Sequence, residues 1–148
     1  MVFGGQENQS FTVRKREVPQ PTESLSILET EHDIQVDTGA LVCTIHKTGS
    51  DFIQSLRING KLIAAGGRLV AIRETRKESA VETVLLHERS VSFIKRAAIE
   101  QSGPVKAVVK IEGVHVLHKT NEEWSPFVIR LTFYAGLSEI GSCAHATD

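Results

Sequence analysis

The sequence predicts an all-β domain whose antiparallel strands close into a barrel or pack as a sandwich. Two stretches, residues 33–72 and 101–136, alternate apolar and polar residues in short runs that turns separate. Neither stretch contains a convincing helix pattern. Several short strands at hairpin spacing are typical of barrels and sandwiches. A length of 148 residues suits one domain with its own hydrophobic core.

Apolar residues at every second position mark half-buried strands in the first half of the chain. Ile34 and Val36 alternate with polar neighbours, and a glycine-containing turn follows. The series continues at Leu41, Cys43 and Ile45, so we expect Cys43 to point into a core. Further strands are predicted from residue 25, over residues 52–58 and from residue 69.

Asn59-Gly60 is the strongest turn signal in the sequence. A type I′ turn needs positive φ at both central residues, which Asn and Gly tolerate best. We therefore expect a hairpin that pairs residues 55–58 with residues 61–64.

Residues 73–89 are ambiguous between helix and strand. Val81, Val84 and Leu85 lie near helical spacing, which is compatible with an exposed helix. We favour a strand around residues 81–86, because the neighbouring segments are strands.

Two strong strands dominate the second half of the chain. Apolar residues occupy every second position of residues 105–111 and again of residues 127–133. After Gly113 the apolar phase shifts to Val114 and Val116. A glycine at such a phase change indicates a β-bulge, where one extra residue re-aims the side chains.

The predicted organisation is one β-domain between two irregular ends. Residues 1–24 are rich in glycine, proline and polar residues and predict a loosely attached tail. The β-domain is expected over residues 25–140. Residues 141–148 lose the alternation and predict an irregular tail. We therefore expect a fold incomplete at both ends, in which a missing final strand leaves an unpaired sheet edge.

Charge and composition exclude several classes of partner. The formal net charge is -1, so no basic field attracts nucleic acid or an anionic membrane. No apolar run reaches the length of a membrane span. The N-terminal residues show no secretory signal, which predicts a cytoplasmic location by default, or secretion if the true N-terminus is missing.

The residue pattern assembles no active site, and we expect no catalytic residue, cofactor or metal site. His115 and His118 are three residues apart on a predicted strand, so they point to opposite faces and cannot share a metal. Cys43 lies in a core-facing series, which argues against a nucleophile. A disulfide between Cys43 and Cys143 is unsupported, because the sequence does not show that they meet.

Three residues are candidates for sugar contact. Trp124 stands in a predicted polar loop, where an indole can stack on a sugar ring; the favoured alternative is that it folds back over the barrel mouth. Arg130 and Tyr134 share a strand face, where arginine could pair with a uronate carboxylate and tyrosine could move a proton. The favoured alternative makes both ordinary outward residues of a half-exposed strand.

Four sequence blocks, spread over about 100 residues, resemble the N-terminal β-domain of exo-acting rhamnogalacturonan lyases, described as a RIFT-type barrel. In chain order the blocks are IQVDTGALVCTI, KTGSDFIQSLRINGKLIAAGGRLVAI, EQSGPVKAVVKIEG and WSPFVIRLTFYAG. The chain departs from the family at both ends: it lacks the usual Gly-, Trp- and Pro-rich opening, and after FYAG the expected alternating strand is not found.

The resemblance implies a pectin-degrading polysaccharide lyase that cleaves rhamnogalacturonan I by β-elimination. In that reaction a cation neutralises the uronate carboxylate, a base removes the C5 proton and the C4 substituent leaves. The family's helical toroid is thought to carry the catalytic groups, and this chain contains none of it. We therefore expect a chain that is inactive alone and meets pectic polysaccharide or oligosaccharide through the full-length enzyme. The alternatives are a stand-alone carbohydrate-binding module and a structural or interaction domain.

Overall fold

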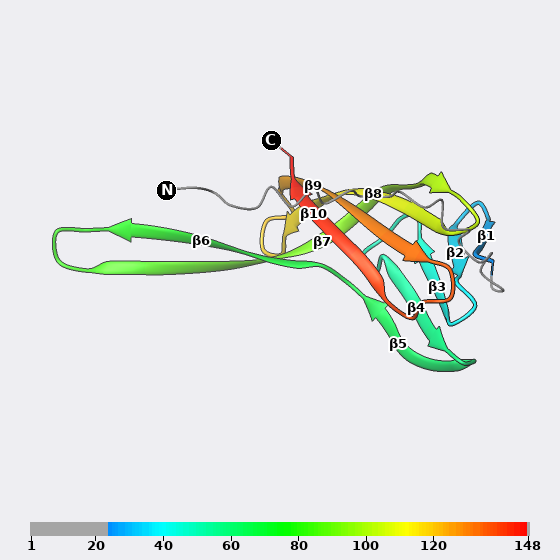
Figure 1. Cartoon of the computed structure of the whole chain (residues 1–148). Helices are drawn as coiled ribbons and strands as arrows, with labels where there is room; N and C mark the ends of the chain where they lie inside the picture. The colour runs from blue at the N-terminus through cyan, green and yellow to red at the C-terminus, as the bar shows by residue number, and fades with distance from the viewer. Residues whose placement is uncertain (1–23, 148) are drawn as a thin grey trace, which may run out of the picture.

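The computed structural model describes residues 24–147, which form two antiparallel sheets of five strands each (Figure 1). Within each sheet every strand pairs with the next along the chain, so both sheets are up-and-down meanders. Sheet A contains β1 (Ser26–Glu29), β2 (Asp33–Asp37), β3 (Leu41–His46), β4 (Ile53–Ile58) and β5 (Lys61–Gly67). Sheet B contains β6 (Val70–Glu78), β7 (Thr83–Ser102), β8 (Lys106–Leu117), β9 (Glu123–Tyr134) and β10 (Ile140–Ala146). The described part contains no helix, and the prediction of a barrel-like, all-β sandwich is confirmed.

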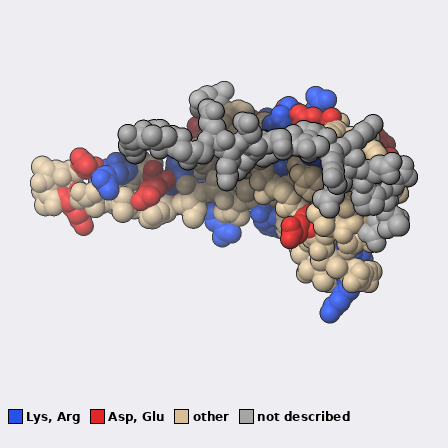
Figure 2. Space-filling model, in the orientation of Figure 1, with Lys and Arg blue, Asp and Glu red and all other residues tan. Residues whose placement is uncertain are grey.

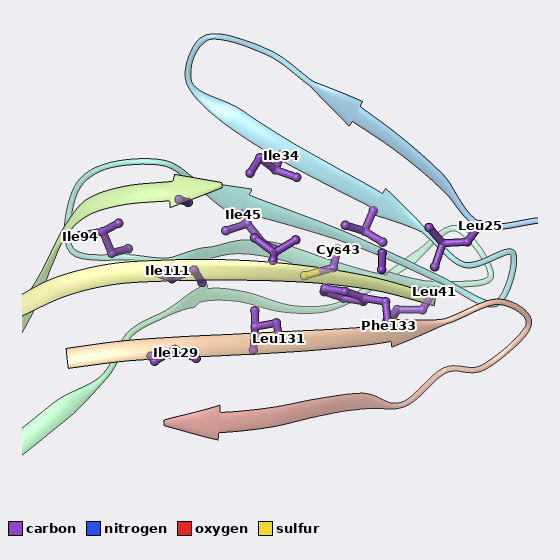
Figure 3. Close-up of a cluster of buried hydrophobic side chains, with 14 of the residues drawn as sticks. Leu25, Ile34, Leu41, Cys43, Ile45, Ile94, Ile111, Ile129, Leu131 and Phe133 are labelled. Carbon is purple, nitrogen blue, oxygen red and sulfur yellow. The ribbon is translucent and has the colours of Figure 1, made fainter. Parts of the chain in front are cut away.

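The core lies between the two sheets and is built by the alternation seen in the sequence. Side chains at every second position are buried, and their neighbours are not, along β2 and β3, over residues 106–112 of β8 and over residues 127–134 of β9. Figure 3 shows Ile34, Cys43, Ile111 and Phe133 reaching into this layer from strands of both sheets. The inward placement of Cys43 is therefore confirmed, and the apolar cluster holds the two sheets together.

The Asn59-Gly60 hairpin forms as expected. Asn59 has a φ of 51° and Gly60 a φ of 74°, which are the positive values that a type I′ turn requires. Ile58 pairs with Lys61 directly beside the turn, and a register shift follows after Leu56.

The bulge predicted near Gly113 is confirmed, although its extra residue lies on the neighbouring strand. Ile94 of β7 pairs with Gly113, and Arg96 pairs with Glu112. Lys95 is left without a partner on β8 and is the extra residue. The bulge lets β7 and β8 stay paired on both sides of the phase change.

Residues 73–89 are β-structure, as favoured, but they form a hairpin rather than one strand. Strand β6 pairs with the first part of β7, and Val81 lies in the turn between them. Strand β8 joins β7 only at Ser90, so the outer part of this hairpin has just two strands. It projects far from the sandwich (Figure 1). We call residues 72–89 the arm.

Strand β10 corrects the prediction for the end of the chain. An irregular segment was expected from residue 141, yet β10 pairs with β9 from Ile140 opposite Phe133 to Ala146 opposite Phe127. Pairing at a sheet edge depends on backbone hydrogen bonds, and the β10 side chains are largely exposed, so no apolar alternation is needed. The predicted tail over residues 1–24 lies outside the described residues except for Ser24.

The buried Thr38 joins the two sheets through a set of hydrogen bonds. Its hydroxyl donates to the Leu137 carbonyl oxygen at 2.8 Å and accepts from the Leu41 amide at 3.0 Å. Its own carbonyl accepts from the Gly136 amide at 2.6 Å. The β2–β3 turn of sheet A is therefore fastened to the β9–β10 turn of sheet B.

We expect Thr38→Val to lower the free energy of unfolding by about 1–3 kcal/mol, because the isosteric methyl removes the acceptor of the buried Leu41 amide and the donor to the Leu137 carbonyl. Thr38→Ser keeps the hydroxyl and is the matched control. Urea unfolding followed by circular dichroism measures both. Equal midpoints for the valine and serine variants would show that the hydroxyl contributes nothing.

Candidate functional site

Trp124 lies near the start of β9 and is half-buried in an aromatic cluster. Its ring centroid is 6.0 Å from that of His115, and the His115 ring lies 4.9 Å from that of Phe127. The Arg73 guanidinium of the arm stands 6.0 Å from the Trp124 ring. One side of the indole is therefore occupied by side chains of this domain, and its role in sugar contact stays a prediction.

Two polar atoms in this cluster are buried without a hydrogen-bond partner among the described residues. They are Nδ1 of His115 and Nε1 of Trp124. Burial lowers the pKa of His115 below its ordinary value of 6.5, because the imidazolium form would lose its hydration. Burial thus favours the neutral imidazole of His115, whose ring lies against Trp124 and Phe127.

This burial predicts a loss of stability in acid. As the pH falls, the unfolded chain takes up a proton at His115 before the folded chain does. The free energy of unfolding is therefore highest above pH 6.5 and declines as the pH falls through and below that value. Thermal unfolding at about pH 8 and about pH 5 measures the decline. His115→Phe should reduce it, whereas His32→Phe, at an exposed site, should leave it unchanged. An equal decline in both variants would contradict this origin.

Arg130 and Tyr134 share the outer face of β9, as predicted, but Arg130 is already engaged. Its Nε donates to Glu100 at 2.8 Å and its second nitrogen donates to the same carboxylate at 3.2 Å. This hydrogen bonding raises the pKa of Arg130 and lowers that of Glu100. Tyr134 is 40% exposed, and the Lys106 ammonium lies 6.0 Å from its ring.

The three candidate sugar contacts do not converge on one site. Trp124 lies near the beginning of β9 and Tyr134 at its end. A strand advances roughly 3.3 Å per residue, so these two residues are on the order of 30 Å apart along β9. A single sugar ring cannot touch both, and any contact with Arg130 and Tyr134 would be a separate site.

The structure assembles a different concave site at the base of the arm. A cavity of about 500 Å³ is lined by residues of β6, β7 and the segments beside them: Arg68, Val70, His87, Glu88, Arg89, Val91, Leu117, His118 and Lys119. We call it the basic pocket. The His118 amide donates to the Arg89 carbonyl oxygen at 3.1 Å, which brings the β8–β9 turn against β7. Val70 and Val91 are directly paired and form an apolar patch in its wall.

The charges of the basic pocket favour an anion. Its one carboxylate, Glu88, accepts a hydrogen bond from Arg73 Nε at 2.8 Å, which neutralises it. Arg68 pairs with Asp51 at 3.0 Å. Arg89 and Lys119 enter no ion pair within residues 24–147. These cations are far apart in the sequence, so only the pairing of β7 with β8 and the turn that follows β8 brings them together, and no local motif predicts the site.

The cysteines and histidines form neither a disulfide nor a metal cluster in the described residues. Cys43 and Cys143 are both free, one buried and the other exposed. Burial raises the pKa of Cys43 to about 12, so its thiol is not an available nucleophile. Residues 24–147 contain no group of three or more potential metal ligands. The same residues contain no helix long and apolar enough to cross a membrane.

The fold and these surfaces belong to a β-sandwich domain of rhamnogalacturonan lyase type. A family model described as "PcRGLX-like protein central beta sandwich domain" matches residues 25–146, and the chain belongs to this family. The match confirms the resemblance seen in the sequence. The description calls the domain central, whereas the resemblance implied an N-terminal position.

A much longer bacterial protein shares this domain. It is named "Uncharacterized protein YetA", from Bacillus subtilis (strain 168), and is 94% identical over 140 residues. The matched stretch makes up 95% of this chain but only 16% of that protein. The chain therefore spans a small part of the curated relative that it matches.

Proposed function

We propose that this chain is a non-catalytic β-sandwich domain of a longer pectin-degrading protein that cleaves rhamnogalacturonan I by β-elimination. The observation that carries the proposal is the family match, which spans nearly the whole β-domain. The chain represents 16% of its B. subtilis relative, so there is room elsewhere in the longer protein for catalytic groups.

An assay of the purified chain tests its non-catalytic role. Elimination creates a carbon–carbon double bond conjugated with the uronate carboxylate, so product formation is followed by ultraviolet absorbance. Incubation with rhamnogalacturonan I oligosaccharides should give no rise in absorbance, with and without added divalent cations. Steady turnover by the 148-residue chain would overturn the assignment.

A second role, binding of acidic oligosaccharide, is favoured by the basic pocket. Its volume of about 500 Å³ is in the range of small-ligand sites. Arg89 and Lys119 offer charged donors for a uronate carboxylate, and the paired Val70 and Val91 offer an apolar patch for the C–H face of a sugar ring.

Trp124 makes this binding measurable, since it is the chain's one tryptophan. Arg73 links the indole to Glu88 in the pocket wall. Titration with galacturonate-containing oligosaccharides should therefore change tryptophan fluorescence, and neutral oligosaccharides should not.

Matched variants locate the binding site. The double variant R89A/K119A should weaken binding about tenfold or more, because both charged donors are lost. Arg130→Ala removes an arginine that Glu100 already engages and is the matched control. Unchanged affinity in R89A/K119A, or equal loss in the control, would exclude the basic pocket as the binding site.

A further inference from the structure

The arm presents apolar side chains to solvent on both of its faces. Cross-strand pairing places Ile72 and Leu85 on one face and Val84 and Leu86 on the other, with Val81 at the tip. These five side chains are between 41% and 96% exposed. A two-stranded ribbon is at best marginally stable in water, so several exposed apolar side chains on it favour a partner that covers them.

The positive and negative charges of the arm are balanced, which argues against a partner that binds by its own net charge. Residues 72–89 contain four arginines and lysines and four glutamates. Figure 2 shows acidic and basic side chains interspersed along the arm, with other residues between them. A nucleic acid or an anionic membrane would be attracted by a net positive surface, which the arm lacks. The arm fits a protein surface with an apolar groove.

We propose that the arm docks into an apolar groove formed by another part of the same, longer polypeptide. Most of the B. subtilis relative lies outside the matched 140 residues, and the family model describes a central domain. Strand β10 ends at Ala146 opposite Phe127, which pairs with Gly113 of β8. Gly113 in turn pairs with Ile94 of β7, on the strand that continues from the arm. Polypeptide that continues from β10 therefore starts from the same sheet as the one from which the arm projects. A tethered partner needs less affinity than a free one, because its effective concentration is high.

Amide hydrogen exchange in two proteins tests the docking directly. The 148-residue chain and the full-length B. subtilis relative are compared under the same conditions. Amides of the arm should exchange at least about tenfold more slowly in the longer protein, because docking suppresses opening of the two-stranded ribbon. Amides of the β4–β5 hairpin, outside the arm, serve as the internal reference. Equal exchange of the arm in both proteins would overturn the proposal.

Two leucine-to-serine variants distinguish an effect of docking from the effect of removing any exposed leucine. Leu85→Ser in the arm should lower the Tm of the longer protein and leave that of the 148-residue chain unchanged. Leu62→Ser removes a leucine of similar exposure on β5 and should change neither. Light scattering of the chain at increasing concentration should show a monomer. A dimer that dissociates when Leu85→Ser is introduced would instead show that a second copy of the chain covers the arm. That result would overturn the proposal.

Discussion

Replacing Phe133 with alanine is expected to lower the free energy of unfolding by about 3–5 kcal/mol. Phe133 is fully buried on β9, between Ala107 of β8 and Ile140 of β10, and its ring fills the layer between the sheets. Its removal loses apolar burial and leaves a cavity that the rigid strands cannot close. Urea unfolding of the chain measures the change.

The next residue along the strand gives the matched control. Tyr134 points to the opposite face and is 40% exposed, so Tyr134→Ala should cost no more than about 1 kcal/mol. A Phe133→Ala variant as stable as Tyr134→Ala would mean that the two sheets are not held together by this core.

Gly113→Ala should destabilise the domain by about 3 kcal/mol, although it adds only one methyl group. A Cβ at this position would lie 2.5 Å from Phe127 Cζ and would overlap the Phe93 carbonyl oxygen. The Phe127 ring is buried and the Phe93 carbonyl is fixed in β7, so neither can move without disturbing the bulge. Thermal unfolding monitored by circular dichroism measures the loss.

Gly141→Ala is the control for this glycine. A Cβ there would meet Thr132 Cβ at 3.5 Å, an ordinary contact, on the edge strand β10. We expect a change within about 0.5 kcal/mol. Similar effects at both glycines would indicate that loss of backbone freedom, rather than close packing at Gly113, sets the cost.

The sequence predicted the elements whose signals are local. Alternation at Ile34 and Phe133 identified core-facing strands, and Asn59-Gly60 identified its hairpin, because side-chain parity and positive φ are properties of neighbouring residues. The strand β10 was missed because an exposed edge strand needs only backbone pairing. The arm was predicted only in part: one strand was favoured around residues 81–86, whereas the structure has two strands with Val81 in the turn between them.

The candidate site was harder to predict because it depends on contacts between distant strands. Arg89 and Lys119 are far apart in the sequence and meet only because β7 pairs with β8 and the turn beyond it. Arg130 looked free in the sequence, yet Glu100 on β7 of the same sheet binds it. The family was predicted correctly because the resemblance rested on four sequence blocks in the same order over much of the chain, and on no single local motif.

The most direct test of the account measures unsaturated product from rhamnogalacturonan I oligosaccharides with the full-length B. subtilis relative beside the 148-residue chain. We predict product from the longer protein and none from this domain alone, as the proposed function requires. Absence of product from the longer protein, in an assay where a known lyase is active, would contradict the proposed pectin-degrading function. Product from the isolated domain would contradict its non-catalytic role.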